Sequence, residues 1–254
     1  MDYQYVDPAL PRTSDGWRSP ALGLDMPLVH YGHAGHPLLL FPTAAADCYE
    51  CERFFLIKAV EPAIMAGRIR VISIESINRY AWMDRNLPPK EQARRQALYS
   101  GYLENELVPF IRNLVGHGQA RIAVSGASFG AFHAANAYFR RPDLYDTLIA
   151  MSGFYDLGPD YLKGYSDDNC YYNNPTWFVP NLGGGYLDLL RTACRTIIVT
   201  GQGQWEAPEC SRSFSRLLHD KGIPHALDLW GHDVAHDWPW WRKMLPYFVD
   251  KLWP

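Results

Sequence analysis

Short apolar runs alternate along most of the chain with longer stretches in which apolar residues recur at helical spacing. The short runs indicate buried strands, and the helical spacing indicates amphipathic helices. In chain order, the pattern predicts strands at 26–31, 37–41, 70–74, 147–152, 196–200 and 225–230, and helices at 50–66, 89–114, 209–221 and 240–252. A further strand and helix flank Ser128. This alternation predicts an α/β fold with a mainly parallel central sheet and helices on both faces.

Turn-forming and helix-breaking residues refine these elements. Gly32 and Gly35 lie between the first two strands, so we expect those strands to form an antiparallel pair. Pro109 lies inside the second helix and is expected to bend it, because proline removes a backbone donor.

Residues 155–190 differ in composition from the rest of the chain. They are rich in Tyr, Asn, Asp, Gly and Pro and show little periodicity. Long irregular segments inside compact domains are often functional, so we expect an excursion over the sheet edge that serves as a lid. We identify no internal repeat and no linker, and we therefore expect residues 1–254 to form a single domain.

Composition and charge narrow the class of protein. The 254 residues include 48% hydrophobic and 20% charged residues, and the net charge is −3 without a basic run. Nucleic acid is therefore not expected as a partner. No apolar stretch is long enough to span a membrane, and Met1–Pro8 lacks the features of a signal peptide. These features predict a cytoplasmic protein and leave a homo-oligomer open.

Metal and cofactor sites are not expected. The five cysteines are widely spread, and Cys48 and Cys51 form a single C-x-x-C without the second ligand pair that zinc requires. His232 and His236 have the spacing of two metal ligands, but no third cluster accompanies them. We therefore expect no metal and no cofactor.

The sequence around Ser128 is the strongest indication of a catalytic site. An apolar run from Ile122 leads into Gly126-Ala-Ser128-Phe-Gly130, and an alanine-rich helical pattern follows. A Gly-x-Ser-x-Gly between a strand and a helix is typical of a nucleophile elbow. Glycines on both sides suit the close backbone approach of such a turn, so Ser128 is the expected nucleophile.

A serine nucleophile needs a base and an acid that orients the base. In this type of fold the order along the chain is Ser, acid, His. The loop after the last strand offers His232 and His236, and we favour His236 because it lies further out, just before the final helix. His232 directly follows the strand end and stays the alternative.

The acid is expected in the loop after the strand at 196–200. That loop contains no aspartate, but it contains Glu206 and Glu209. We favour Glu206, because Glu209 falls in the first turn of the next helix, where a carboxylate is favoured by the helix dipole. Asp228 and Asp233 are the alternatives elsewhere.

An oxyanion intermediate needs two N–H donors. One expected donor is the backbone N–H of Phe129, directly after the nucleophile. The other is expected from the loop at 42–47, where small residues let the backbone approach a substrate. Ala44 and Ala45 are both candidates.

Three stretches together resemble the putative-esterase (esterase D-like) branch of the α/β-hydrolase superfamily, which is related to the first carbohydrate-esterase family. They are Phe41–Thr43, Gly126–Ala134 and His236–Arg242. The resemblance implies an α/β-hydrolase fold, a hydrolase without a cofactor, the nucleophile at Ser128 and the base at His236. The family often has aspartate as the acid, whereas this chain offers Glu206.

We therefore expect a serine esterase that cleaves small-molecule carboxylic esters through an acyl-enzyme. Acyl transfer or thioester cleavage on the same triad is the alternative, because the resemblance covers these reactions too. From a different class, the chain could be a binding protein without catalysis. Aromatic residues such as Trp205 and Trp238 crowd the expected site loops, and they would suit an aryl or sugar-bearing ester if they face the cleft.

Overall fold

The computed structural model describes residues 5–254, so the first four residues of the N-terminal stretch considered above lie outside it. The strands are β1 (Arg12–Arg18), β2 (Asp25–Tyr31), β3 (His36–Phe41), β4 (Ile69–Ile74), β5 (Ile122–Ala127), β6 (Tyr145–Met151), β7 (Arg195–Thr200) and β8 (Ala226–Leu229). The helices are α1 (Glu50–Arg53), α2 (Leu56–Met65), α3 (Pro89–Tyr102), α4 (Val108–Leu114), α5 (Phe129–Arg140), α6 (Asp168–Tyr171), α7 (Pro175–Phe178), α8 (Gly184–Thr192), α9 (Pro208–Asp220) and α10 (Trp238–Leu252).

The strands of the described residues form one eight-stranded sheet in the order β1-β2-β4-β3-β5-β6-β7-β8. Neighbouring strands are parallel from β4 to β8, whereas β1–β2 and β2–β4 are antiparallel. The expected α/β architecture with a mainly parallel sheet is confirmed. Because the strands that bear the loops of interest are parallel, their carboxyl ends meet at one edge.

The expected antiparallel pair of strands at 26–31 and 37–41 is wrong. β4 lies between β2 and β3 and pairs with both. The glycine turn crosses the start of β4, where a Cβ at Gly35 would collide with the backbone of Arg68 and Ile69. The N–H of His36 also bonds to the carbonyl of Arg68 at 3.0 Å. The turn therefore packs against a third strand instead of closing a hairpin.

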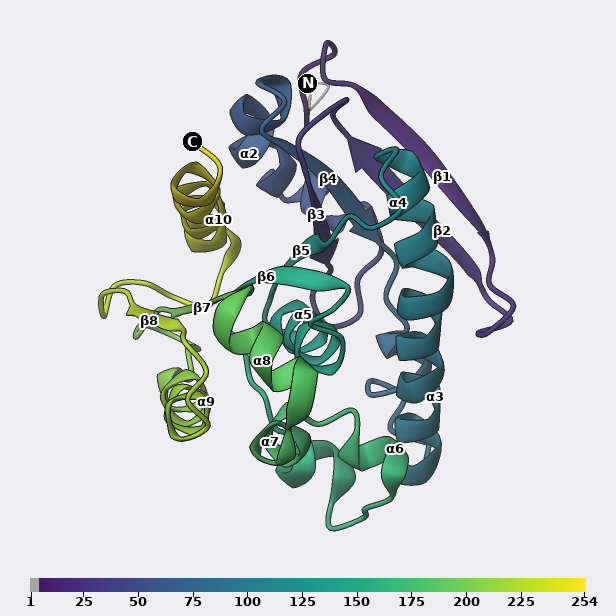
Figure 1. Cartoon of the computed structure of the whole chain (residues 1–254), viewed down its shortest axis with the longest axis vertical. Coiled ribbons are helices and arrows are strands. Elements are labelled where there is room, and N and C mark those ends of the chain that lie inside the picture. Colours follow the sequence, from purple (N-terminus) through teal and green to yellow (C-terminus); the bar gives the residue numbers. More distant parts are fainter. Residues whose placement is uncertain (1–4) are drawn as a thin grey trace.

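Helices cover both faces of the sheet (Figure 1). α2 and α10 pack on one face, and α3, α4, α5 and α9 contribute to the core on the other. In β3, Leu38 and Leu40 belong to the first core while Leu39 and Phe41 belong to the second, and all four are buried. Burial on both faces explains why the parallel strands are continuous apolar runs instead of alternating ones.

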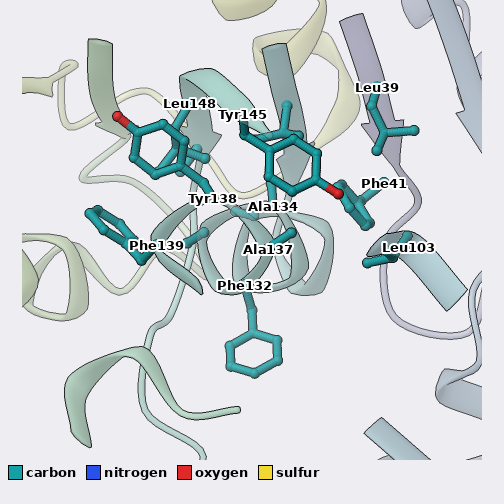
Figure 2. Close-up of a cluster of buried hydrophobic side chains, with 14 of the residues drawn as sticks. Leu39, Phe41, Leu103, Phe132, Ala134, Ala137, Tyr138, Phe139, Tyr145 and Leu148 are labelled. Carbon is teal, nitrogen blue, oxygen red and sulfur yellow. The ribbon is translucent and has the colours of Figure 1, made fainter. Parts of the chain in front are cut away.

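α5 is the central helix of the second core. Figure 2 shows Ala134 and Ala137 of this helix beneath Tyr145 and Leu148 of β6, while Phe132 points away from the strands. The small alanine side chains let the helix lie close to the sheet, and every residue from Phe129 to Phe139 is buried. Close packing fixes the helix that begins directly after Ser128.

Two expected helices contain irregular turns. The helix at 50–66 is interrupted between α1 and α2, where Phe55 adopts a left-handed φ of 61°. The helix at 89–114 contains a π-helical turn at Leu103–Leu107, between α3 and the α4 helix in which Pro109 lies; the expected bend at Pro109 stays a prediction. Proline cannot donate to the preceding turn, and a wider turn accommodates its ring.

The sequence pattern predicts neither β1 nor the helices between 155 and 190. β1 is almost entirely exposed and pairs only with β2, so its sequence carries no apolar alternation. α6 and α7 have four residues each and α8 has nine, which is too short for a clear period. Among the described residues, no helix combines the length and the apolar character needed to cross a membrane.

Candidate active site

The loops that carry the expected site residues all leave the carboxyl edge of the parallel strands. Ser128 follows β5, and Glu206 lies in the loop after β7. His236 lies after β8, and the segment with Ala44 and Ala45 follows β3. In open α/β sheets this edge is where ligands bind.

Ser128 has the geometry of a nucleophile elbow. Its φ of 56° and ψ of −121° lie outside the regions that non-glycine residues normally adopt. Its N–H donates to the carbonyl of Met151 at 3.0 Å, which ties the turn to β6. Strain of this kind occurs mainly at functional sites, where the surrounding structure holds it.

The two glycines of the motif are required by close backbone contacts. A Cβ at Gly130 would lie 2.5 Å from the carbonyl oxygen of Phe41 and 2.8 Å from that of Pro42. A Cβ at Gly126 would collide with the backbone of Gly130. The turn therefore packs directly on the end of β3, which brings Ser128 beside the loop that follows Phe41.

That loop is held by a buried carboxylate. Glu50 accepts bonds from the N–H of Thr43 at 2.7 Å and from its hydroxyl at 2.6 Å. Burial raises the pKa of Glu50, although the bonds from Thr43 oppose this effect. The carbonyl of Ala45 accepts a bond from Nε of Arg79 at 2.7 Å. These contacts fix the segment that contains Ala44 and Ala45.

Phe129 is the first residue of α5. The first N–H groups of a helix have no partner within the helix, and they carry the positive end of its dipole. The Phe129 N–H is therefore suited to receive a developing negative charge beside Ser128.

The carboxylate of Glu206 is surrounded by donors. Oε1 accepts from the hydroxyl of Ser152 at 2.5 Å and from the N–H of Gly201 at 3.2 Å. Oε2 accepts from the hydroxyl of Thr200 at 3.0 Å and lies 3.4 Å from Nδ1 of His236. The side chain is only 1% exposed, so these groups replace the water that an exposed carboxylate would bind.

The environment of Glu206 favours its ionised form. Burial raises its pKa, but the hydrogen bonds and charge of His236 and the bonds from Ser152 and Gly201 outweigh burial and lower the pKa overall. An ionised carboxylate next to Nδ1 orients the imidazole so that Nε2 is free to act as a base.

His236 is held by its backbone as well as by Glu206. Its N–H donates to the carbonyl of Gln204 at 2.9 Å, and its ring packs edge-on against Trp241 at a centroid distance of 5.1 Å. Among residues 5–254, Ser128 and His236 form no direct hydrogen bond. Such bonds are often long without a substrate and shorten when one binds.

The alternative residues lie elsewhere. His232 and Asp233 are exposed, and Asp228 belongs to β8, where it is paired with Val199. Glu209 is 74% exposed and forms an ion pair with Arg212. The structure thus brings Glu206 and His236 together and leaves the competing carboxylates apart from this pair.

The aromatic residues of the site loops divide into two groups. Trp241 and Trp82 are buried, which fits packing as the reason for their presence. Trp205 is 82% exposed in a left-handed conformation with φ of 64°, next to Glu206. Tyr80 is also exposed. Only some of these aromatic residues are therefore exposed and able to contact a ligand.

Sequence reasoning missed Ser152 and Thr200, which both donate to Glu206. Each lies at the carboxyl end of a parallel strand, Ser152 directly after β6 and Thr200 as the last residue of β7. A polar residue at the end of a buried apolar run was the available signal.

The C-x-x-C pair lies in the core on the α2 face. Cys48 and Cys51 are buried free thiols, and burial raises the pKa of each to about 12. No group of three or more His, Cys, Asp or Glu side chains within residues 5–254 is arranged to hold a metal ion.

A nucleophile elbow and a carboxylate–histidine pair at the carboxyl edge of this sheet define an α/β-hydrolase. The profile of the family described as "Putative esterase" matches residues 66–251, which is more than half of the chain. The chain belongs to the putative-esterase family, and the resemblance inferred from the sequence is confirmed. No curated protein matches the chain.

Solved structures share the fold over nearly the whole chain. A ferulic acid esterase superposes with a TM-score of 0.72 at 16% identity, over 96% of this chain and 98% of its own. The fluorophosphonate-binding serine hydrolase FphF of Staphylococcus aureus gives 0.73 at 13% identity, over 96% and 99%. An S-formylglutathione hydrolase from Agrobacterium tumefaciens gives 0.69 at 13% identity, over 96% of both chains.

At these identities the likeness shows the α/β-hydrolase fold. The fold and the membership of the putative-esterase family together identify the chain as a carboxylic-ester hydrolase of the serine type.

Proposed function

We propose that Ser128, His236 and Glu206 form the catalytic triad of this hydrolase and that it works through an acyl-enzyme. The observation that carries the proposal is the buried Glu206 carboxylate next to Nδ1 of His236, at the same sheet edge as the strained elbow of Ser128. A serine, a carboxylate and an imidazole in this order along the chain are typical of α/β-hydrolases.

In the proposed reaction, Oγ of Ser128 attacks the ester carbonyl carbon while Nε2 of His236 takes the hydroxyl proton. The carbonyl oxygen becomes an oxyanion, which the N–H groups of Phe129 and of Ala44 or Ala45 stabilise. The imidazolium then protonates the leaving alcohol as the C–O bond breaks. Water attacks the acyl-enzyme by the reverse sequence and releases the acid.

Glu206 contributes by charge and orientation. Its anion balances the imidazolium that forms during both steps, and it holds the tautomer with hydrogen on Nδ1. The lowered pKa of this carboxyl keeps it ionised near neutral pH.

Small-molecule esters and thioesters are the substrates to test. Two structural neighbours are described as a ferulic acid esterase and an S-formylglutathione hydrolase, so an aryl ester and a thioester are the informative pair. The decisive experiment is labelling with a fluorophosphonate together with turnover of p-nitrophenyl acetate. We expect wild type to be labelled at Ser128 and to turn over the ester, and the proposal fails if label attaches elsewhere or not at all.

We propose that residues 155–190 border the acyl pocket and act as a lid. Tyr161 in this segment packs on Phe129, next to the nucleophile, with ring centroids 5.6 Å apart. Tyr161→Ala should change KM for esters of long acyl groups more than KM for acetate. Equal changes for both would contradict the lid.

The expected single domain, the cytoplasmic location, the absence of a nucleic-acid partner and the oligomeric state stay predictions.

A further inference from the structure

A hydrogen-bonded chain links the last helix of the fold to the carboxylate of Glu206. Nε1 of Trp241 in α10 lies 3.0 Å from Oγ of Ser152, and Oγ of Ser152 lies 2.5 Å from Oε1 of Glu206. Ser152 and Trp241 are only 5% and 4% exposed. Because water has little access to these groups, each bond has to be made within the protein.

The direction of the bonds in this chain is fixed by chemistry. An indole N–H can only donate, and an ionised carboxylate can only accept. The hydroxyl of Ser152 therefore accepts from Trp241 and gives its single proton to Glu206. Donation to an ionised acceptor makes this bond stronger than one between neutral groups, and the short distance agrees.

The backbone of Ser152 is specialised for this task. Its φ of 50° places it in the left-handed region, which is costly for a residue with a side chain. Its N–H bonds to the carbonyl of Val199 at 2.7 Å, so β7 holds the turn in place. A glycine would adopt this conformation without strain, yet the position carries a hydroxyl that reaches the carboxylate.

Trp241 also contacts the base. Its ring meets the ring of His236 edge-on, with centroids 5.1 Å apart and an interplanar angle of 86°. One side chain of α10 thus packs against the imidazole and, through Ser152, anchors the carboxylate that orients the imidazole.

We propose that Ser152 and Trp241 are positioning residues of the acid–base pair, which hold the Glu206 carboxylate in the orientation that serves His236. The inference rests on the proposed triad and extends it to two residues that act through Glu206 and His236. Glutamate has one more rotatable bond than aspartate, so a glutamate acid needs more anchoring. Ser152, Thr200 and Gly201 supply this anchoring from the ends of β6 and β7.

Loss of the Ser152 hydroxyl would leave Oε1 with the Gly201 N–H, and Oε2 with Thr200 and His236. The carboxylate would be free to turn toward the end of β7 and away from the imidazole. The imidazolium of the transition state would then be less stabilised, whereas ground-state binding of an ester does not involve this pair. We therefore expect kcat to fall and KM to stay constant.

The first experiment compares Ser152→Ala with Ser152→Gly. Both remove the hydroxyl, but glycine relieves the left-handed backbone, so the two variants should differ in stability. We expect both to lose about 10- to 100-fold in kcat with unchanged KM, the range of a hydrogen bond to a charged group. The rate of fluorophosphonate labelling at Ser128 should fall by the same factor.

The rescue variant is Ser152→Thr, which keeps the hydroxyl. A β-branched residue at positive φ is strained, so we expect a lower midpoint of thermal unfolding but kcat within about 3-fold of wild type, since the charged hydrogen bond is retained. If Ser152 had only a structural role, its variants would lose kcat and thermal stability together. Should this variant fail to fold, the Ala and Gly variants still decide the question.

The role of Trp241 is tested with Trp241→Phe, which keeps an aromatic ring beside His236 and removes the N–H. We expect a loss of about 2- to 10-fold in kcat, the range of a neutral hydrogen bond. Trp240→Phe is the matched control on the same helix; its ring lies under Lys243 instead, and kcat should not change. In the Ser152→Gly background, Trp241→Phe should have almost no further effect, because the chain is already broken.

The inference is overturned if folded Ser152→Gly and Ser152→Ala retain wild-type kcat, or if KM rises while kcat is constant. It is also overturned if Trp241→Phe costs as much in the Ser152→Gly background as in wild type. These outcomes differ from failure of the triad itself, in which wild type would not be labelled at Ser128.

Discussion

The two halves of the proposed catalytic site, Ser128 on one side and the Glu206–His236 pair on the other, are held by different means. On the nucleophile side, Ser128 is fixed by its own backbone and by two glycines, of which Gly130 packs against the end of β3 and Gly126 packs against Gly130. On the acid–base side, Glu206 and His236 are fixed by hydrogen bonds that converge on the Glu206 carboxylate, by the backbone N–H of His236 and by Trp241. Close backbone packing is disturbed by added atoms, whereas a hydrogen-bonded cluster is disturbed by the loss of a donor. We therefore expect different kinds of substitution to damage the two sides.

The largest effect is expected from Ser128→Ala. Loss of the nucleophile should lower kcat by roughly 10⁶-fold, with a residual rate from the oxyanion donors and substrate binding. The midpoint of thermal unfolding should hardly change, because the hydroxyl is not needed by the elbow. Steady-state turnover of p-nitrophenyl acetate measures the loss, and wild-type turnover in the purified variant would remove Ser128 from the mechanism.

His236→Ala should be nearly as damaging, because base and nucleophile act as a unit. The control is His232→Ala in the same loop, whose exposed side chain should be replaceable with little loss. Both variants are compared by kcat/KM after their folding has been checked by circular dichroism. A larger loss in the His232 variant would move the base to that residue.

Glu206→Gln should lower kcat by about 10⁴-fold, since an amide carries no charge to balance the imidazolium and can favour the wrong tautomer. The matched control is Glu209→Gln, three residues further along and mostly exposed, which should keep almost full activity. If both variants behave alike, the acid–base side depends on another carboxylate.

Gly130→Ala tests how closely the backbone is packed on the nucleophile side. The added methyl would meet the carbonyl oxygens of Phe41 and Pro42 at 2.5 and 2.8 Å, and such overpacking costs about 1–3 kcal/mol of unfolding free energy. Gly118→Ala is the control, because a Cβ there meets nothing within 4 Å. Urea unfolding measures both, and equal stability of the two variants would show that the elbow is not closely packed.

The same contrast explains what the sequence could predict. The elbow lies within one short segment of sequence, so its strand, glycines, serine and helix could be predicted together. The parallel strands and long helices were predictable because burial on both faces makes their apolar runs continuous. Glu206 and His236 were inferred because they lie in the loops that follow two predicted strands and agree with the chain order Ser, acid, His that is typical of this fold.

Other features depend on contacts between distant segments. The anchoring of Glu206 joins Ser152 directly after β6, Thr200 in β7 and Trp241 in α10. No local pattern links Ser152 to Trp241, 89 positions apart. The pairing of β2 with β4 likewise depends on a later strand that inserts beside the glycine turn. The helices between 155 and 190 were missed because they are too short to show a period.

The smallest effect concerns the pH dependence of stability on the acid–base side. The pKa of Glu206 is lowered in the folded state, despite burial, by His236, Ser152 and Gly201. Its ionised form therefore stabilises the fold above the unfolded-state pKa, for which the ordinary value is 4.5, and this contribution is lost as the pH falls through the lower folded-state value. Glu206→Gln cannot titrate, so the difference in unfolding free energy between wild type and this variant should shrink as the pH falls from neutral to acidic. Glu209→Gln, which removes only a surface ion pair, should give a small difference at every pH. A gap that widens in acid would mean that the ionised carboxylate destabilises the fold, and the cluster around Glu206 would then not be the support described above.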